Sequence, residues 1–474
     1  MTDLCFLTAR ELRAALGRRE VSAREVLQAH LDQIGRLNPQ INAVITLDVD
    51  RAAHAAAAAD ELAASGADLP VLHGLPVAHK DLHETAGLLT TYGSPVRADY
   101  VPEHDALVIE RMRRAGVITI GKTNVPEFGA GSHTFNPLFG ATRNPYDPGR
   151  SAGGSSGGTA AALACGMHPI GDGSDMGGSL RNPASFCNVV GFRPSPGRVP
   201  GWPALLGWST MGVSGPMART VADAALLLSV LAGPDPRSPI ALETPGSRFA
   251  APLDFDPGAG PHRLRVAFSP DLGGAVPVEP EVAAAVQSAA QVFAGLGAEV
   301  TEACPSFAGA DEVFRTLRAW SFEATFGALE AQSPGQFKAT LRDNIAQGRA
   351  LTGPDLARAE QLHTVLFHRV RQFFGRYDIL LLPVSQVLPF DVELEYPAEV
   401  NGVPMTDYLD WMRSAYLVSA TGCPAASVPA AFSASGLPIG VQIAGPHRAD
   451  FEVLQAGHVF EQATQIGQRR PPAA

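Results

Sequence analysis

Lysine is nearly absent from this chain of 474 residues. Only Lys80, Lys122 and Lys338 occur among 36 basic residues, and all the others are arginine. A chain so biased toward arginine is expected to keep lysine where arginine cannot replace it. Arginine stays protonated in proteins, whereas a buried lysine can give up its proton. The three lysines are therefore candidates for a chemical role that requires loss of a proton.

Excess positive charge is also missing. The formal net charge is −11 and the pI is about 5.6. Sustained binding to a phosphate backbone requires clustered positive charge, so this composition disfavours a nucleic-acid partner. An apolar content of 46% with 18% charged residues is ordinary for a globular protein that buries a large core.

Paired cysteines and long apolar runs are absent as well. The cysteines are odd in number and far apart, which is typical of free thiols in a reducing compartment. They are Cys5, Cys165, Cys187, Cys304 and Cys423. The first residues lack the basic and apolar regions of a secretory signal, and no run of about 18 uncharged apolar residues predicts a membrane span. We therefore expect a cytoplasmic protein without a membrane partner.

Helical and strand patterns alternate along most of the chain. Capping-box spacing at Thr8–Glu11 and Ser22–Glu25 predicts two helix starts. Further helices are expected at 48–65, 105–115, 159–167, 279–296 and 451–463, and strands at 71–80, 117–120, 264–268, 379–382, 425–428 and 439–443. This alternation predicts an α/β fold with a large mixed, mostly parallel β-sheet covered by helices on both faces.

Two regions interrupt the alternation. The segment 234–261 is rich in proline, glycine and serine, so it is either a linker or a long surface loop. The segment 311–374 is expected to be all-helical. The length alone allows two or three domains, although large α/β enzymes often form one unit.

Two glycine-serine segments hold the residues with the clearest chemistry. Gly149–Gly158 contains Ser155, and Gly173–Arg181 contains Ser179. Acyl transfer requires a nucleophile, a base that activates it and donors for the oxyanion. Lysine, with an ordinary pKa of about 10.4, can be the base near neutral pH only if burial lowers that value by roughly 3 pH units. Lys80 follows a short apolar run, where such burial is expected.

Ser179 is preceded by Gly177 and Gly178. Two consecutive glycines allow positive φ angles, so that successive N–H groups can converge on one oxygen atom. An isolated Gly-Gly-Ser more often forms only a turn, and the pattern by itself leaves both interpretations open.

Lys80, the GGSSGG segment and the segment 175–184 together resemble the three parts of the amidase signature family. Ser155 and Ser179 are 24 residues apart, as the family motif requires. The flanking segments 121–128, 136–140, 186–194 and 436–443 are similar too. The resemblance spans nearly the whole chain. It implies one amidase signature domain over 1–474, with a signature core at about 70–200 and the helical excursion at about 311–374.

The resemblance also implies a Ser-cisSer-Lys triad. Ser179 would attack the carbonyl and form an acyl-enzyme, while Ser155, after a cis peptide bond, would relay the proton to neutral Lys80 and later to the leaving amine. The oxyanion hole would be formed by the backbone amides of Met176, Gly177, Gly178 and Ser179. Supporting positions are Ser156, Asp175 and Arg181, and Gly129 is a candidate substrate contact. The chain departs from the family pattern at Met176, Thr159 and Asn188, which affects substrate preference rather than the proton path.

The expected function is hydrolysis of the C–N bond of a small-molecule amide, with no cofactor and no metal. An ester or a carbamate could use the same triad. Two other hypotheses remain: a glutaminase subunit of a tRNA-dependent amidotransferase, which would pass ammonia to a partner, and a catalytically silent binding relative. The sequence leaves a homo-oligomer open.

Two further motifs suggest other chemistry. Gly116–Thr123 fits the Walker A pattern, but its variable positions read as a strand and no helix follows, so we reject nucleotide binding and interpret Lys122 as structural. Gly153–Gly157 fits G-x-S-x-G, which requires a preceding strand that the sequence does not predict. In that alternative, a later histidine such as His447 or His458 would be the base.

Histidines and aromatic residues give weaker signals. His79 and His83 suggest a metal pair, but in an extended segment they would lie about 13 Å apart, too far to share an ion. We expect them to be solvated or supporting residues. Phe314, Trp320, Phe322 and Phe326 are expected to pack in the core of the helical excursion rather than to line a substrate pocket.

Overall fold

The computed structural model describes residues 3–259 and 263–472. Its helices are α1 (Ala9–Gly17), α2 (Ala23–Ile41), α3 (Val49–Ser65), α4 (Leu107–Arg114), α5 (Gly157–Ala164), α6 (Arg181–Phe186), α7 (Val221–Leu231), α8 (Pro280–Gly295), α9 (Ala310–Gln332), α10 (Ala339–Ala350), α11 (Gly353–Phe373), α12 (Arg413–Ser419) and α13 (Asp450–Thr464). Both predicted capping boxes are present, at Thr8 before α1 and at Ser22 before α2.

The strands form one large sheet, a smaller one and two short hairpin pairs. They are β1 (Val44–Leu47), β2 (Pro76–Lys80), β3 (Ile118–Thr123), β4 (Phe135–Asn136), β5 (Gly140–Ala141), β6 (Ile170–Asp175), β7 (Val190–Arg193), β8 (Val213–Ala218), β9 (Arg265–Phe268), β10 (Glu299–Glu302), β11 (Ile379–Pro383), β12 (Glu399–Val400), β13 (Val403–Pro404), β14 (Ala425–Phe432) and β15 (Pro438–Ala444). Most of the predicted elements are present within a few residues of their expected bounds.

The large sheet has eight strands in the order β10-β9-β11-β15-β14-β7-β8-β6. The predicted α/β class and mixed sheet are confirmed. The expectation of a mostly parallel sheet is wrong, because only the pairs β10–β9 and β9–β11 are parallel and the other neighbours are antiparallel. A short turn joins β14 to β15 without a helix between them, and such hairpins give antiparallel neighbours.

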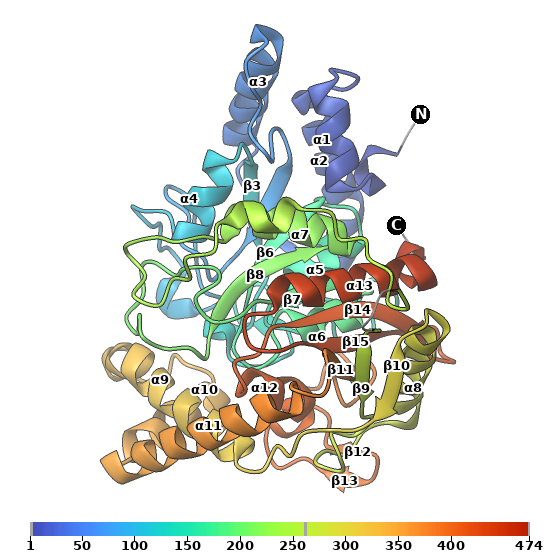
Figure 1. Cartoon of the computed structure of the whole chain (residues 1–474). Coiled ribbons are helices and arrows are strands. Elements are labelled where there is room, and N and C mark those ends of the chain that lie inside the picture. Colours follow the sequence, from blue (N-terminus) through green and yellow to red (C-terminus); the bar gives the residue numbers. More distant parts are fainter. Residues whose placement is uncertain (1–2, 260–262, 473–474) are drawn as a thin grey trace.

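Helices cover both faces of this sheet (Figure 1). Along β11, Ile379 and Leu381 belong to one apolar core, while Leu380 and Leu382 belong to another. Side chains alternate between the faces of a strand, so each face of the sheet contributes to its own core. Helices α7, α8 and α13 contribute to the first core, and α9 and α12 contribute to the second.

A three-stranded sheet in the order β1-β3-β2 lies beside the edge strand β6. The strand predicted at 71–80 is shorter than expected, since 71–74 form a turn and β2 begins at Pro76. Every residue of β2 is buried. This position places the end of β2 against the end of the large sheet, where the candidate site lies.

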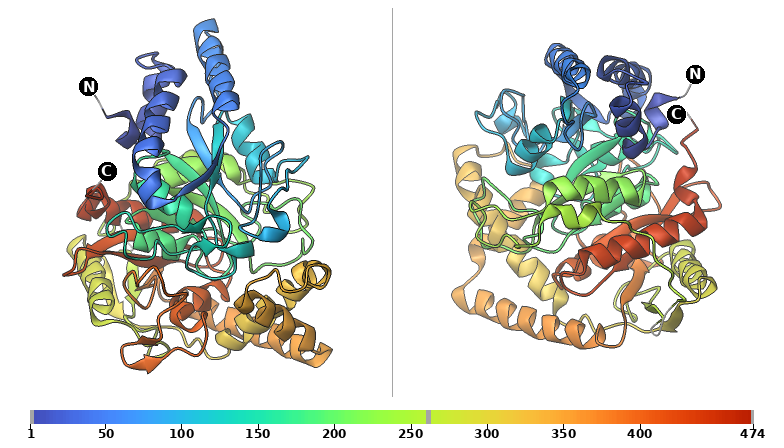
Figure 2. Two further views of the ribbon diagram at one scale, coloured as in Figure 1. Left: turned by 180° about the vertical axis from the view of Figure 1, so that it is seen from behind. Right: turned by 45° about the horizontal axis from the view of Figure 1, so that its top comes forward.

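The segment 311–374 is occupied by α9, α10 and α11, which gather at one side of the molecule, away from the N-terminal helices α1 to α3 (Figure 2). Within the segment 234–261, Phe249 and Leu253 are buried against the main core, and residues 260–261 lie outside the described part. In the described ranges, no helix is both long and apolar enough to cross a membrane.

Candidate active site

Lys80 is the last residue of β2, and its side chain is completely buried. The strand is anchored by parallel pairing with β3, and Val77 and Ala78 before the lysine have no exposed surface. The backbone N–H of Lys80 donates to Asp172 on β6 at 3.1 Å. The sequence therefore delivers a lysine from an apolar strand directly into the interior.

Hydroxyl groups surround the Lys80 amine. Its Nζ lies 2.8 Å from Ser155 Oγ, 2.8 Å from Ser156 Oγ and 3.0 Å from Ser174 Oγ. Burial lowers the pKa of Lys80 to about 7, although the charges of Asp175 and Asp172 oppose this shift. A substantial fraction of this amine is therefore neutral near pH 7, and it can accept a proton from Ser155.

Ser155 and Ser179 line the same cavity, which has a volume of about 410 Å³. The Gly154–Ser155 peptide bond is cis. The structure brings Lys80 into contact with Ser155 and Ser156, but within the described residues no direct hydrogen bond joins the hydroxyls of Ser155 and Ser179. Their backbones are close, because the N–H of Ser156 donates to the carbonyl of Ser179 at 3.2 Å.

The loop before Ser179 depends on its glycines. Gly178 has a φ of +116°, and a Cβ at this position would lie 2.6 Å from both Ala415 Cβ and Asn182 Nδ2. A Cβ on Gly177 would lie 2.8 Å from the ring of Phe314. Only glycine fits these positions, so the turn places Ser179 at the cavity wall.

The N–H of Gly178 donates to Asp175 Oδ1 at 2.9 Å. This amide of the expected oxyanion hole is therefore already engaged. The carboxylate also accepts the N–H of Leu180 at 3.2 Å, which closes the loop around it. The amides of Met176, Gly177 and Ser179 remain the candidates for binding an oxyanion.

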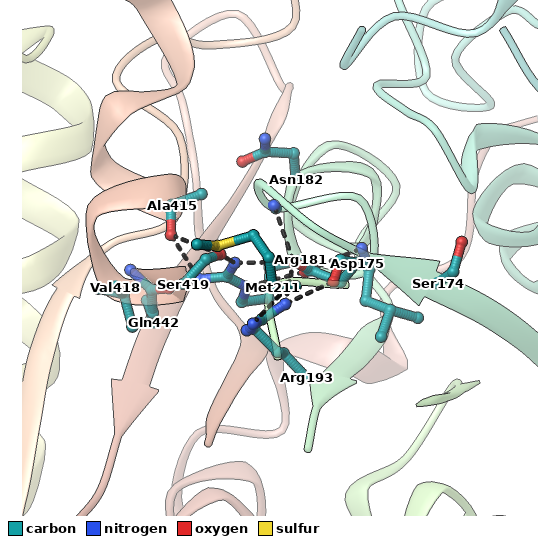
Figure 3. A network of polar contacts seen from close by, with 12 residues as sticks. Ser174, Asp175, Arg181, Asn182, Arg193, Met211, Ala415, Val418, Ser419 and Gln442 are labelled. Atoms are coloured by element: carbon teal, nitrogen blue, oxygen red, sulfur yellow. Dashed lines mark hydrogen bonds and ion pairs between the residues drawn. The ribbon is translucent and has the colours of Figure 1, made fainter. Parts of the chain in front are cut away.

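Asp175 is held by two buried arginines (Figure 3). Arg181 Nε and Nη2 lie 3.0 Å from its two oxygen atoms, and Arg193 Nη1 lies 3.1 Å from Oδ1. Burial opposes ionisation, but these guanidinium groups hold the pKa of Asp175 well below its usual range. Arg181 also donates to Ser419 Oγ at 2.7 Å and to Gln442 Oε1, which fixes the serine loop to α12 and β15.

The two histidines near Lys80 share one carboxylate. His79 Nδ1 and His83 Nδ1 each lie 2.6 Å from an oxygen of Asp172. The expected separation is wrong, because the chain turns after Lys80 instead of staying extended, with His83 N–H donating to Lys80 O. Both rings are buried rather than solvated. Asp172, which the sequence analysis missed, joins the strand of the lysine to β6.

The other lysines are also buried. Lys122 Nζ donates to the carbonyl of His83 and lies 2.9 Å from Thr85 Oγ1. Burial lowers the pKa of Lys122 to about 8. Residues 118–123 of the Walker-like segment form β3, so they offer no phosphate-binding loop. Lys338 donates to the carbonyl of Ala130, and burial lowers its pKa to about 8 as well.

The histidines of the alternative hydrolase triad lie elsewhere. His447 packs edge-on against Phe367, and His458 lies 3.4 Å from Asp254. Neither lines the cavity of Ser155 and Ser179. The base beside Ser155 is Lys80, so the G-x-S-x-G interpretation is wrong. Within the described residues, no cluster of three or more His, Cys, Asp or Glu side chains could hold a metal ion.

The cavity wall is largely apolar. Gly129 lies against it, and a Cβ there would be 3.5 Å from Ser155 Oγ. Phe322 and Phe326 line the cavity, so the expectation of core packing alone is wrong for them, whereas Phe314 is a core residue and Trp320 lies outside this wall. A second cavity of about 600 Å³ adjoins the first and shares Phe326 with it.

Two functional candidates carried no signal in the sequence. Ser174 contributes a hydroxyl to Lys80 from the end of β6. Arg318 projects into the cavity from α9, about 140 residues from the serine loop. No short motif contains either residue, and only the tertiary fold brings them to the site.

The family described as Amidase has a sequence profile that matches residues 25–454 of this chain. Among curated proteins, the acylamidase of Rhodococcus erythropolis is 34% identical over 99% of this chain and 98% of that protein. A subunit of the glutamyl-tRNA(Gln) amidotransferase of Synechococcus sp. (strain RCC307) is 34% identical over 97% of this chain and 98% of that protein.

Solved structures of the same fold cover the whole chain. A bacterial aryl acylamidase of the amidase signature family has a TM-score of 0.90 at 30% identity, covering 98% of this chain and 99% of that one. A 6-aminohexanoate cyclic dimer hydrolase has a TM-score of 0.88 at 28% identity, covering both chains completely. These likenesses extend over every element described above.

Proposed function

Because this chain belongs to the amidase signature family and is an enzyme that hydrolyses amide C–N bonds, we propose that Ser179, Ser155 and Lys80 form its catalytic triad. The contact that carries this proposal is the 2.8 Å distance between Lys80 Nζ and Ser155 Oγ in a fully buried setting. We also propose that residues 1–474 form a single domain that acts in the cytoplasm.

Acylation begins with a proton transfer. Neutral Lys80 accepts the proton of Ser155, and Ser155 in turn accepts the proton of Ser179. Ser179 Oγ then forms a bond to the amide carbon, and the carbonyl π electrons move to the oxygen. A general base of this kind contributes about 10²–10⁴-fold to the rate.

The negative oxygen of the tetrahedral intermediate needs fixed donors. We assign this role to the backbone N–H groups of Met176, Gly177 and Ser179, since that of Gly178 is bonded to Asp175. Donors that are already in place require no reorganisation when the charge develops. Asp175, held by Arg181 and Arg193, keeps the loop in this shape.

Collapse of the intermediate breaks the C–N bond. The proton stored on Lys80 passes through Ser155 to the leaving nitrogen, which departs as a neutral amine. Water then attacks the acyl-enzyme, giving its proton along the reverse path, and the carboxylic acid is released with Ser179 restored.

The cavity favours acyl or amine groups with apolar bulk. Phe128, Phe322 and Phe326 form much of its wall, and flat rings pack well against such side chains. Relatives named acylamidase and aryl acylamidase support the same class. We therefore propose acyl amides, including aryl amides, as substrates. An ester or carbamate with the same acyl group would use the same triad.

A hydrolysis screen tests this function. Acetanilide, butyranilide, their phenyl ester counterparts and aliphatic amides are incubated with the wild type and with Ser179→Ala. We expect amine release from at least one anilide by the wild type and none by the variant. Turnover of esters alone would restrict the function to an esterase. Absence of turnover on every compound, together with no labelling by a fluorophosphonate probe, would support a silent binding relative.

The identity to the amidotransferase protein favours one second candidate. A glutaminase subunit would release ammonia from glutamine and depend on another chain. Ammonia release from glutamine, with co-purification of a second chain from the native host, would favour this candidate over an independent amidase.

A further inference from the structure

Arg318 is a buried cation in the wall of the catalytic cavity. It lies in the third turn of α9, is 5% exposed, and lines the same space as Ser155 and Ser179. Its guanidinium packs over the ring of Phe322, 4.1 Å from the ring centroid. The ring therefore fixes the plane of the guanidinium at the cavity surface.

The polar partners of Arg318 are all neutral. Nε donates to Asn344 Oδ1 at 3.1 Å, Nη2 donates to Tyr408 Oη at 2.6 Å, and Nη1 lies 3.5 Å from Met176 Sδ. No carboxylate of the described residues lies within 4.0 Å of it. A guanidinium has five N–H donors, and a thioether is a weak acceptor. Donor capacity is therefore left on Nη1 and Nη2.

This arrangement differs from that of the other buried arginines. Arg181 and Arg193 pair with Asp175, and Arg198 pairs with Asp450 at 3.0 Å. An unpaired buried charge is costly, and removing a partner from a buried pair typically costs about 3–5 kcal/mol. An arginine kept without a carboxylate in a substrate cavity is what an anionic ligand requires.

The surroundings reinforce the positive charge. Lys338 is near enough for the Arg318 charge to contribute to its lowered pKa, and both cations lie by the ring of Tyr408. The lysine has its own acidic neighbour, with Nζ 3.7 Å from Glu395. Of the two cations, Arg318 is the one that lines the cavity.

Contact with Met176 connects Arg318 to the catalytic loop. Met176 begins the segment that we assign to the oxyanion hole, and its sulfur touches the guanidinium. A group bound to Arg318 is therefore part of the molecule whose carbonyl faces Ser179. We propose that Arg318 binds a carboxylate carried by the amide substrate and so determines specificity; this inference rests on the proposed amidase function.

The carboxylate can belong to the acyl or to the amine part, and matched substrates distinguish these sources. Succinanilic acid and its neutral counterpart valeranilide place the difference on the acyl side. 4-Acetamidobenzoate and 4-methylacetanilide place it on the amine side. We expect the wild type to prefer the charged member of one pair by at least about 10-fold in kcat/KM.

Arg318→Gln separates recognition from structure. We expect kcat/KM for the preferred anionic substrate to fall at least about 30-fold, mainly through KM, and to change less than about 3-fold for its neutral counterpart. Arg318→Lys should keep part of the preference. Equal losses on both members of the pair, or no preference in the wild type, would overturn the inference.

Arg315→Gln is the matched control. Arg315 lies on the same helix but is paired with Asp407 and Asp410, both at 2.6 Å. Its loss removes one arginine without removing the cavity charge, so the ratio of anionic to neutral turnover should stay unchanged. A similar change of ratio in this control would also contradict the assignment.

Binding to inactive protein makes the test independent of turnover. In Ser179→Ala protein, calorimetry should show at least about 10-fold tighter binding of the anionic member than of the neutral one, and loss of that difference when Arg318→Gln or Arg318→Lys is added. If the wild type hydrolyses no amide, the proposed function fails while this measurement still decides the inference. Equal binding of both members refutes it.

Discussion

Lys80 Nζ and Ser155 Oγ lie 2.8 Å apart, with both side chains buried. Ser156 and Ser174 complete a group of hydroxyls around the amine. Hydroxyls can donate to a neutral amine but cannot balance a charge as a carboxylate can. The setting therefore favours the form of lysine that accepts a proton, which is the form that acyl transfer needs.

Replacing Lys80 by arginine tests whether the proton or the charge matters. Arginine keeps the charge but cannot be deprotonated in proteins. For Lys80→Arg we expect kcat/KM on an anilide to fall about 10²–10⁴-fold, the contribution of a general base. Lys338→Arg is the control, since that buried lysine lies outside the triad, and it should keep most of the activity. Near-normal turnover by Lys80→Arg would refute the neutral base.

Asp172 should adjust the acidity of Lys80. Its carboxylate raises the pKa of the lysine, so Asp172→Asn should move the acid limb of the kcat/KM profile to lower pH. Loss of the contacts to His79 and His83 should also lower the free energy of unfolding by about 2–4 kcal/mol.

Asp450→Asn provides the comparison for this electrostatic effect. Asp450 is a buried aspartate paired with Arg198, and it is not among the charges that shift Lys80. The variant should lose stability without moving the acid limb. A shift of the same size in both variants, measured from pH 5 to 9, would contradict the assigned role of Asp172.

Gly178→Ala should damage the serine loop. The added Cβ would meet Ala415 and Asn182 at 2.6 Å, and alanine is strained at a φ of +116°. We expect the free energy of unfolding, measured in urea, to fall by about 3 kcal/mol, from about 1–2 kcal/mol of backbone strain plus about 1–3 kcal/mol of crowding.

Gly66→Ala isolates the backbone part of that loss. Gly66 has a φ of +76° with no neighbouring atom within 4 Å of the added Cβ, so only about 1 kcal/mol should be lost. If both alanine variants lost the same stability, crowding around Gly178 would not be what fixes the loop.

The sequence allowed much of the site to be predicted. A lone lysine after an apolar run and two serines among glycines each have a local physical reason, and the structure places Lys80 against Ser155. The histidine pair was misjudged because its separation depends on a turn at 81–83 rather than on residue type. Asp172 and Arg318 could not be found, since their roles arise from partners about 90 and 140 residues away.

The direction of the strands was harder to predict than their existence. Apolar runs such as those of β11 and β15 indicate burial on both faces, and this pattern is usual in parallel sheets. Here β11 and β15 are antiparallel and still buried on both faces, since helices cover both sides. Burial alone therefore does not report strand direction.

The most direct test of the central claim is the rate of Ser179 acylation as a function of pH. In single-turnover measurements with an activated anilide, the wild-type rate should rise tenfold per pH unit below about 7 and level off above it, because only neutral Lys80 accepts the proton. This inflection should vanish in Lys80→Met. A rate that does not depend on pH between 5 and 9, or an inflection near 7 that persists in Lys80→Met, would contradict the account.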